Sequence, residues 1–345
     1  MSIEAMADVI HKEPDAIWQE FINDEEALLR IKGIRAEYRT ERAKFCALNG
    51  LDLMIRRGES LGLVGETGAG KTTAALSVLN LLPKDIGFVV GGSIEFDGRN
   101  VQKMSEKELK IMRGGKISMI FQNPLTALNP VFAIGEQISV VLRVHQNLNR
   151  RQAMERSCEL LEMVGIPRYR IKDYPFQFSG GMRQRVGIAA ALACNPMLLI
   201  ADEPTTALDV TIQAQILELM RTLQEKYTTS FLMITHNLGI IAELCQNVAV
   251  MYAGRVIEYG EVNSVFSSPL HPYTLGLIGA LPSLEGPRER LAAIPGTIAD
   301  PRNLPGGCAF HQRCEHCEER CKTEQPPMSH TGDRHFVACF KHENG

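Results

Sequence analysis

The segment best suited to chemistry is the glycine-rich run GETGAGKT at positions 65–72, which follows the apolar run SLGLV. Glycines let successive backbone N–H groups turn toward phosphate oxygens, and the start of a following helix adds the positive end of its dipole. The lysine would bring a mobile positive charge to the phosphates, and the last threonine a hydroxyl ligand for Mg²⁺. The segment consists of Gly65, Glu66, Thr67, Gly68, Ala69, Gly70, Lys71 and Thr72, with Thr73 next in the chain. It predicts a nucleotide phosphate site.

A pair of carboxylates follows a second apolar run, MLLIA, as Asp202 and Glu203. Adjacent residues on a strand point to opposite faces, so the two side chains can take different roles. Asp202 would hold Mg²⁺, and Glu203 would orient and polarise the water that attacks the γ-phosphate. Strand ends are often acidic, so the pair predicts catalysis only because a phosphate segment is present in the same chain.

A serine and two glycines open a third segment, FSGGMRQR, in which apolar spacing predicts a helix. The serine is suited to cap the helix, and exposed backbone N–H groups there offer a second seat for an anion. An ordinary capped helix is the alternative. The residues concerned are Ser179, Gly180, Gly181 and Met182.

The elements that must position these residues alternate between strand and helix. Helices are predicted at Thr72–Leu81, Glu106–Met112 and Ile212–Lys226, and over most of 134–195. Buried strands are predicted at SLGLVG, ISMIF, MLLIA and SFLMI, which indicates a parallel sheet covered on both faces. LLRIKGIRAEY and LDLMI are typical of an antiparallel edge, and VAVMYAG with RVIEYG of a closing hairpin. The fold class expected is therefore α/β.

Composition excludes several classes of protein. Among 345 residues, 37 basic side chains balance 40 acidic ones, which argues against a chain that coats nucleic acid. The N-terminus is acidic where a secretory signal would be basic, and no apolar stretch reaches the roughly 20 residues that span a bilayer. We therefore expect a cytosolic protein that reaches any membrane by docking on another subunit.

The three segments occur in the order seen in ATP-binding cassette (ABC) ATPases, and the chain resembles that family over about residues 28–260. Gln122 resembles the Q-loop glutamine, His236 the switch histidine and Tyr38 the aromatic that stacks on adenine, while Ala207-Leu208-Asp209 resembles the D-loop. Met182 and Asn237 stand where the wider family has Gln and Asp. The resemblance implies a P-loop NTPase fold with a helical subdomain at about 123–195. It also implies ATP as substrate, Mg²⁺ on Thr72, Gln122 and Asp202, and catalysis by Glu203, His236 and Gln122.

Further motifs are similar to those of ATPase subunits of oligopeptide, dipeptide and nickel permeases: QNP, LNP, TTALDVTIQAQIL, MYAGRVIEYG and SPLHPYT. That resemblance implies an ATPase on the cytoplasmic face of the membrane, which energises peptide uptake. Its partners would be a homologous, usually different ATPase chain that shares both ATP sites, two membrane permease subunits and, indirectly, an extracytoplasmic binding protein. Nickel or another small solute is the alternative cargo; a non-transport cassette ATPase and a small-molecule kinase are rival functions. An arm at 1–27 and an extension at 261–345 would flank the cassette.

Five of the nine cysteines crowd the C-terminal extension, whose Pro/Gly-rich sequence offers few apolar residues for a core. In a reducing cytosol this crowding favours metal over disulfides. Four thiolates suit zinc or a [4Fe–4S] cluster, and Cys317 forms a C-x-x-C with Cys314 that favours zinc. The pattern of Cys308, Cys314, Cys321 and Cys339, with Cys317 left over, resembles the tail of dipeptide-permease ATPases, some of which carry a [4Fe–4S] cluster. We therefore expect the cluster, with zinc and unliganded or disulfide-bonded cysteines as alternatives.

Overall fold

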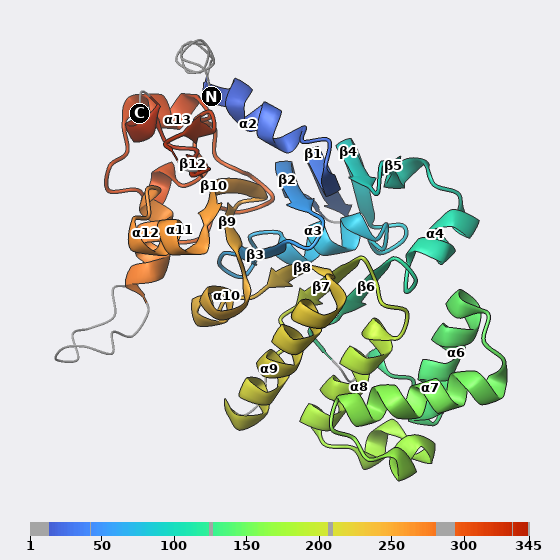
Figure 1. Ribbon diagram of the computed structural model, residues 1–345. Coiled ribbons are helices and arrows are strands. Elements are labelled where there is room, and N and C mark those ends of the chain that lie inside the picture. Colours follow the sequence, from blue (N-terminus) through green and yellow to red (C-terminus); the bar gives the residue numbers. More distant parts are fainter. Residues whose placement is uncertain are drawn as a thin grey trace, which may run out of the picture. The chain divides into compact units, whose positions relative to one another are not determined.

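The computed structural model describes residues 14–41, 43–123, 127–205, 210–280, 294–332 and 334–343 (Figure 1). The chain divides into two compact units. The first unit comprises residues 1–55, 61–100 and 236–345, and the second comprises residues 56–60 and 101–235.

The first unit contains an antiparallel sheet in the order β2-β1-β4-β5. In β1, Leu28, Leu29 and Ile31 are buried, and the strand pairs with β4 along most of its length. The pairing shifts register between Lys32 and Ala36, so the strand is irregular where it passes Gly33. These strands span Ala27–Arg39 (β1), Lys44–Arg56 (β2), Gly87–Phe96 (β4) and Arg99–Asn100 (β5).

A second group of strands in the first unit leads into the glycine-rich segment. β3 pairs with β9 in parallel, and every residue of β3 is buried, as expected for a strand covered on both faces. β9 and β10 form the antiparallel hairpin that the sequence predicts, turning at Ala253 and Gly254 with positive φ, and β12 and β11 follow β10 in order. The bounds are Ser60–Val64 (β3), Asn247–Tyr252 (β9), Arg255–Glu261 (β10), Ser329–His330 (β11) and Phe336–Val337 (β12).

The N-terminal helix α2 is fixed to this unit. Trp18 is only 2% exposed, its ring lies 5.1 Å from that of Phe336, and the rings of Phe21 and Tyr259 are 5.0 Å apart. Figure 1 shows α2 beside the C-terminal strands, with which it makes contact at β11. The helices of this unit are Pro14–Ile22 (α2), Lys71–Val78 (α3), Leu238–Leu244 (α10), Val262–Ser267 (α11), Pro272–Gly279 (α12) and Glu319–Thr323 (α13), with 3₁₀ turns at His311–Arg313 (η5) and Phe340–His342 (η6).

The second unit combines parallel strands with a helical part. β7 pairs in parallel with both β6 and β8. Ser105 and Asn149 form capping boxes that start α4 and α7. The helices α6, α7 and α8 pack on one another. The elements are Val101–Lys103 (η2), Glu106–Met112 (α4), Ile117–Ile120 (β6), Ile134–Gln146 (α6), Arg150–Met163 (α7), Arg168–Lys172 (η3), Pro175–Gln177 (η4), Gly180–Leu192 (α8), Leu198–Asp202 (β7), Val210–Tyr227 (α9) and Ser230–Ile234 (β8).

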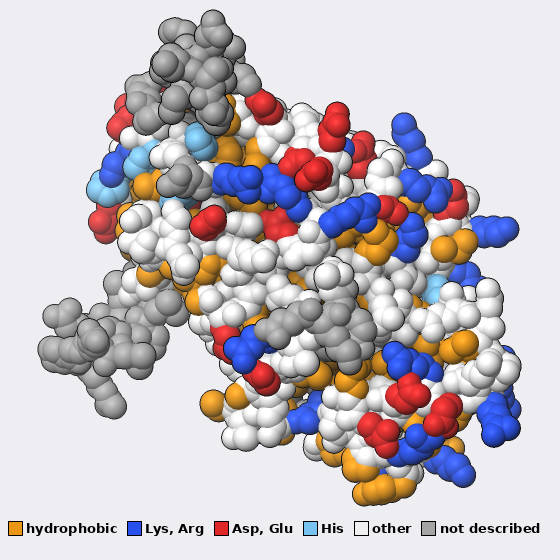
Figure 2. Space-filling model, in the orientation of Figure 1, with side chains coloured by type: hydrophobic (Ala, Val, Ile, Leu, Met, Phe, Trp, Pro, Cys, Tyr) orange, Lys and Arg blue, Asp and Glu red, His pale blue; other side chains and the backbone are white. Residues whose placement is uncertain are grey.

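The predicted α/β class is confirmed by these parallel strand pairs, the antiparallel sheet and the helical part. Within the described ranges, no helix is both long and apolar enough to cross a bilayer. On the face shown in Figure 2, acidic and basic side chains lie among one another.

Candidate functional site

The glycine-rich segment between β3 and α3 makes turns that only glycine tolerates. Gly65 has φ of 152°, and a Cβ there would lie 2.3 Å from the carbonyl oxygen of Met251. Gly70, the residue before α3, has φ of 102°, and its Cβ would lie 2.4 Å from the carbonyl oxygen of Ala47. Any side chain at either position would clash with backbone, so the tight loop at the start of α3 depends on both glycines.

The side chain of Lys71 lies within this loop and binds its backbone. Its side chain is buried, and Nζ donates hydrogen bonds to the carbonyl oxygens of Gly65 at 2.7 Å and Glu66 at 3.0 Å. The ammonium group therefore lies inside the ring of backbone that the loop forms. Thr72 beside it is exposed, so its hydroxyl is available to a ligand. The structure thus brings a buried cation and an accessible hydroxyl to the start of α3, which is the arrangement a phosphate–Mg²⁺ site needs.

Tyr38 reaches the same helix from β1. Its hydroxyl lies 3.4 Å from Oγ1 of Thr73, and its ring stacks on that of Phe45 with centroids 5.3 Å apart. Two aromatic rings thus lie beside the helix that follows the phosphate loop, where sequence reasoning identified only one. Phe45 was missed because a single phenylalanine in a strand is usually part of the core.

Glu66 of the loop is held by two residues far away in the chain. Its carboxylate accepts hydrogen bonds from both Nη atoms of Arg313, at 2.6 and 3.1 Å, and its backbone N–H donates to the hydroxyl of Tyr273 at 2.8 Å. Arg313 also donates through Nε to the carbonyl oxygen of Pro295, and its side chain is only 4% exposed. Sequence reasoning missed Arg313 and Tyr273, because nothing in their local sequence points to a loop more than 200 residues away.

The second unit holds the acidic pair. Asp202 is buried at the end of β7. Glu203 has φ of 47°, an uncommon value for a residue other than glycine, and its backbone N–H donates to the carbonyl oxygen of Ile234 at 2.8 Å. Oε2 of Glu203 accepts a hydrogen bond from Nε2 of Gln122 at 2.9 Å. The structure therefore brings together two of the three residues expected to catalyse.

The third, His236, belongs to the first unit and is exposed. Asn237 after it caps α10, since its Oδ1 accepts a hydrogen bond from the N–H of Gly239 at 3.0 Å. The amide side chain of Asn237 therefore serves as the cap of α10. Asp209, expected in the D-loop, lies outside the described residues.

Ser179 caps α8 as its position in the sequence predicts. Its Oγ accepts a hydrogen bond from the N–H of Met182 at 3.3 Å. Ser179 and Gly180 are exposed, and a Cβ added to Gly180 would meet nothing within 4 Å. Gly181 differs, because its Cβ would lie 2.8 Å from Ile212. This helix start is open to an external ligand while its second glycine packs on α9.

The four cysteines expected to bind a cluster line one small cavity of about 20 Å³ in the first unit, and Cys317 does not. The backbone of Cys308 donates to the carbonyl oxygen of Cys321 at 2.9 Å. Burial raises the pKa of the Cys308 thiol to about 11, against the opposing effect of a hydrogen bond from the backbone of Phe310. No three His, Cys, Asp or Glu side chains in the described ranges are arranged to hold one metal ion. The residue types thus fit a four-thiolate site, but their arrangement does not match a single-ion site.

Comparison with known families gives two matches. Residues 48–206 match the family described as ABC transporter. Residues 257–321 match the family described as the C-terminal region of oligopeptide/dipeptide transporters. The second match begins in β10 and ends at Cys321, so it includes Tyr273, Arg313 and three of the four clustered cysteines.

Several related proteins match along almost the whole chain. The oligopeptide transport ATP-binding proteins AppD of Bacillus subtilis and OppD of Escherichia coli are each 46% identical over 318 residues; the alignments cover 92% of this chain and 97% and 94% of theirs. A putative peptide import ATP-binding protein of Brucella ovis is 47% identical over 327 residues, covering 91% of this chain and 97% of its own.

Solved structures agree with these matches. A dimeric ATP-binding cassette in a post-hydrolysis state with ADP and Pi has a TM-score of 0.62 at 26% identity, covering 68% of this chain and 98% of its own. The cbiO1 protein of Clostridium perfringens, part of the transporter complex cbiONQ, has a TM-score of 0.59 at 28% identity, covering 71% and 92%.

Proposed function

This chain belongs to the ABC transporter family and carries its ATPase cassette, and we propose that it energises the import of di- and oligopeptides. The named relatives transport oligopeptides or import peptides, and each is aligned over more than nine-tenths of its length. The match at residues 257–321 extends the likeness beyond the cassette into a region found in oligopeptide and dipeptide transporters. Nickel or another small solute is the alternative cargo.

The hydrogen bond between Gln122 and Glu203 carries the assignment of catalytic roles. The glutamine amide orients the carboxylate that would polarise the attacking water, and the same glutamine would sense the metal. Lys71 and the loop N–H groups would bind the phosphates, with Thr72 and Asp202 as ligands of Mg²⁺. His236 would donate a hydrogen bond to the γ-phosphate, and Tyr38 with Phe45 would support the adenine.

The open start of α8 supports a site shared between two ATPase chains. Ser179 and Gly180 are exposed at a helix N-terminus, which can bind an anion that another chain presents. We propose that this end closes over the ATP of a homologous partner, and that two permease subunits hold the pair at the cytoplasmic face of the membrane. ATP binding would then favour the closed dimer, and loss of the γ-phosphate would release it.

We further propose that Cys308, Cys314, Cys321 and Cys339 hold a [4Fe–4S] cluster with a structural role. All four line one cavity while Cys317 lies outside it, as the resemblance implies. A [4Fe–4S] cluster takes one thiolate on each of its four irons, so four cysteines that line one cavity match its number of ligands, which is also the number that a zinc site takes.

Metal analysis after anaerobic purification tests the cluster. We expect about four irons per chain. Cys317→Ser should keep the iron, and Cys314→Ser should lose it. One zinc per chain with no iron would contradict the cluster and favour a zinc site. Protein without metal would show that the cysteines bind none.

Transport in vesicles tests the function. The chain, its partner ATPase and the permease subunits encoded with it should be reconstituted with the associated binding protein. We expect ATP-dependent uptake of a labelled tripeptide, and none of nickel. Uptake of nickel without uptake of peptide would contradict peptide import and favour nickel as the cargo. ATPase activity that does not change when the permease subunits are added would favour a non-transport cassette.

A further inference from the structure

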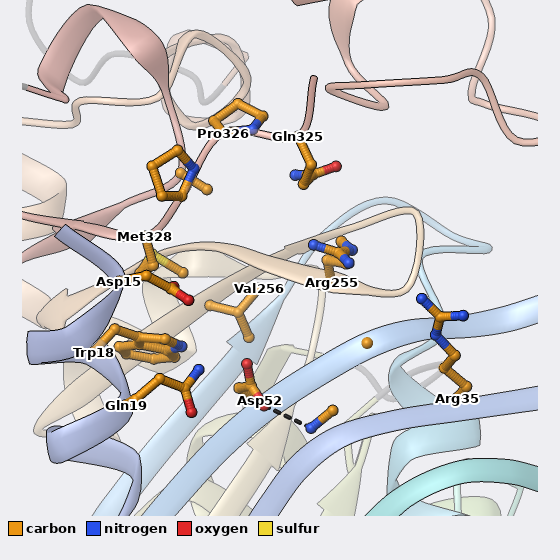
Figure 3. Close-up of a pocket in the computed structure, with 14 residues that line it drawn as sticks. Asp15, Trp18, Gln19, Arg35, Asp52, Arg255, Val256, Gln325, Pro326 and Met328 are labelled. Carbon is orange, nitrogen blue, oxygen red and sulfur yellow. Dashed lines mark hydrogen bonds between the residues drawn. The ribbon is translucent and has the colours of Figure 1, made fainter. Parts of the chain in front are cut away.

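A cavity of about 470 Å³ lies in the first unit, apart from the phosphate loop (Figure 3). Its walls come from α2, from β1 and β2, from β10, and from residues 325–328 of the C-terminal extension. Pockets for small molecules span roughly 300–1,000 Å³, so the volume suits a small organic ligand. None of the residues proposed above to bind nucleotide, Mg²⁺ or a cluster lines it.

The walls carry both signs of charge. In Figure 3 the carboxylates of Asp15 and Asp52 lie on the side of α2, and the guanidinium groups of Arg35 and Arg255 lie on the other. Between them, Val256 offers apolar surface. The cavity therefore has a negative end, a positive end and an apolar middle.

These charges do not pair with one another in the part of the chain that the structure describes. Asp52 accepts the N–H of Gly33 at 2.6 Å, and Arg255 donates through Nε to the carbonyl oxygen of Asn49 at 2.6 Å. Within the described ranges neither makes a salt bridge, and the same holds there for Asp15 and Arg35. The Nη groups of both arginines thus remain available to a ligand.

The pKa shifts of Arg255 and Asp52 agree with a cavity that has one positive and one negative end. Burial, followed by the nearby charge of Arg35, lowers the pKa of Arg255. Burial raises the pKa of Asp52, although the N–H groups of Gly33 and Trp18 oppose that shift. Each end thus holds a partly desolvated charge that an opposite charge on a ligand would stabilise.

We propose that this cavity binds a small zwitterion with free α-amino and α-carboxylate groups, an amino acid or a short peptide. The carboxylate would bind between Arg35 and Arg255, where guanidinium groups can donate paired hydrogen bonds. The ammonium group would bind at Asp15 and Asp52. A ligand carrying one charge would satisfy one end and leave the other unpaired, which gives selectivity for zwitterions. The proposal concerns binding alone and stands whether or not the transporter carries peptides.

Calorimetric titration of the full-length chain without ATP tests whether the cavity binds a zwitterion. The probes are the dipeptide Ala-Ala, its N-acetyl form and its C-terminal amide. Ala-Ala should bind, and each blocked form should bind at least about tenfold more weakly, a loss of about 1.4 kcal/mol. Equal binding of Ala-Ala and its N-acetyl form would reveal a simple anion site and overturn the proposal, as would no heat up to about 10 mM Ala-Ala.

Variants locate the binding. Arg35→Gln and Asp15→Asn change exposed side chains without salt bridges, so the fold should persist with an unchanged melting temperature. Each should weaken Ala-Ala binding about tenfold or more. The controls Arg151→Gln and Asp85→Asn change exposed charges outside the cavity and should leave binding intact. Binding that survives both cavity substitutions, or that falls equally in the controls, would overturn the assignment.

Discussion

Glu203 directly follows the buried strand β7 and combines an uncommon backbone conformation with a hydrogen bond to Gln122. A positive φ at a residue other than glycine costs of order 1 kcal/mol and persists where the surroundings hold it. Here the backbone N–H is held by Ile234 and the carboxylate by an amide. The side chain is thus positioned before any ligand arrives, which limits the reorganisation needed for catalysis.

We expect Glu203→Gln to keep ATP binding but to lower turnover of the assembled transporter by on the order of a hundredfold or more, because the water loses its carboxylate. ATPase rates and nucleotide affinity should be measured on the same preparations. Lys71→Ala is the matched contrast, since it removes the cation proposed to bind the phosphates and should weaken nucleotide binding itself. Near-normal turnover of Glu203→Gln would remove this residue from the catalytic role.

Arg313 joins the C-terminal extension to the phosphate loop through its ion pair with Glu66. Removing this arginine leaves the Glu66 carboxylate without its cation, in the loop proposed to bind phosphate. We expect Arg313→Gln to weaken ATP binding on the order of tenfold, because like charges then repel. Glu66→Gln in the same chain should restore much of the affinity.

A double-mutant cycle compares ATP affinity in Arg313→Gln, Glu66→Gln and the double variant. It measures how much the contact between these two side chains contributes to ATP binding. Iron content measured in parallel separates loss of the ion pair from damage to the cysteine site. Additive effects of the two substitutions would show that the pair does not act on nucleotide binding.

Strand β10 carries a buried carboxylate that fastens the extension. Glu258 accepts hydrogen bonds from the backbone N–H groups of Leu270 and His271 at 2.8 and 2.9 Å and contacts Nε2 of His335 at 2.8 Å. Burial alone would raise its pKa, but His335, Thr274 and the two N–H groups outweigh burial and hold the pKa below 4.5.

This carboxylate should make the fold acid-sensitive. The folded pKa lies below the unfolded one, so the stabilisation is complete above the usual value of 4.5 and is lost as the pH falls through the folded pKa. We expect Glu258→Gln to lower the melting temperature at neutral pH and to flatten its decline below pH 4.5. Melting curves from pH 7 to 3, with exposed Glu106→Gln as control, measure this. An unchanged acid slope in Glu258→Gln would assign the sensitivity to other groups.

Local patterns predicted most elements, and long-range contacts explain what they missed. The strand before the phosphate loop and the β9–β10 hairpin were predicted because apolar alternation and turn residues are local signals. Capping by Ser179 was predicted for the same reason. Arg313 and the charged cavity were not, since both join segments separated by more than 200 residues. For the N-terminal segment the sequence left open an amphipathic helix, with Trp18 resting on the body, or a loose arm, and the structure shows a helix whose Trp18 is buried.

The phosphate loop belongs to the first unit, and the exposed start of α8 belongs to the second. Both suit phosphate, and the shared site proposed above assigns them to different nucleotides. A lone chain would then offer an incomplete set of groups, and the proximity on which catalysis depends would require a second ATPase chain.

We therefore expect a strictly monomeric preparation to hydrolyse ATP at least about a hundredfold more slowly than the complex with the partner ATPase and permease subunits. Rates should be compared per ATPase chain, with oligomeric state checked by light scattering in the same buffer. Ser179→Arg is a sensitive probe, because a bulky charge at the exposed cap should slow the complex while leaving the monomer's ATP affinity unchanged. Monomer activity equal to that of the complex would contradict a shared site, and so would full activity of the Ser179→Arg complex.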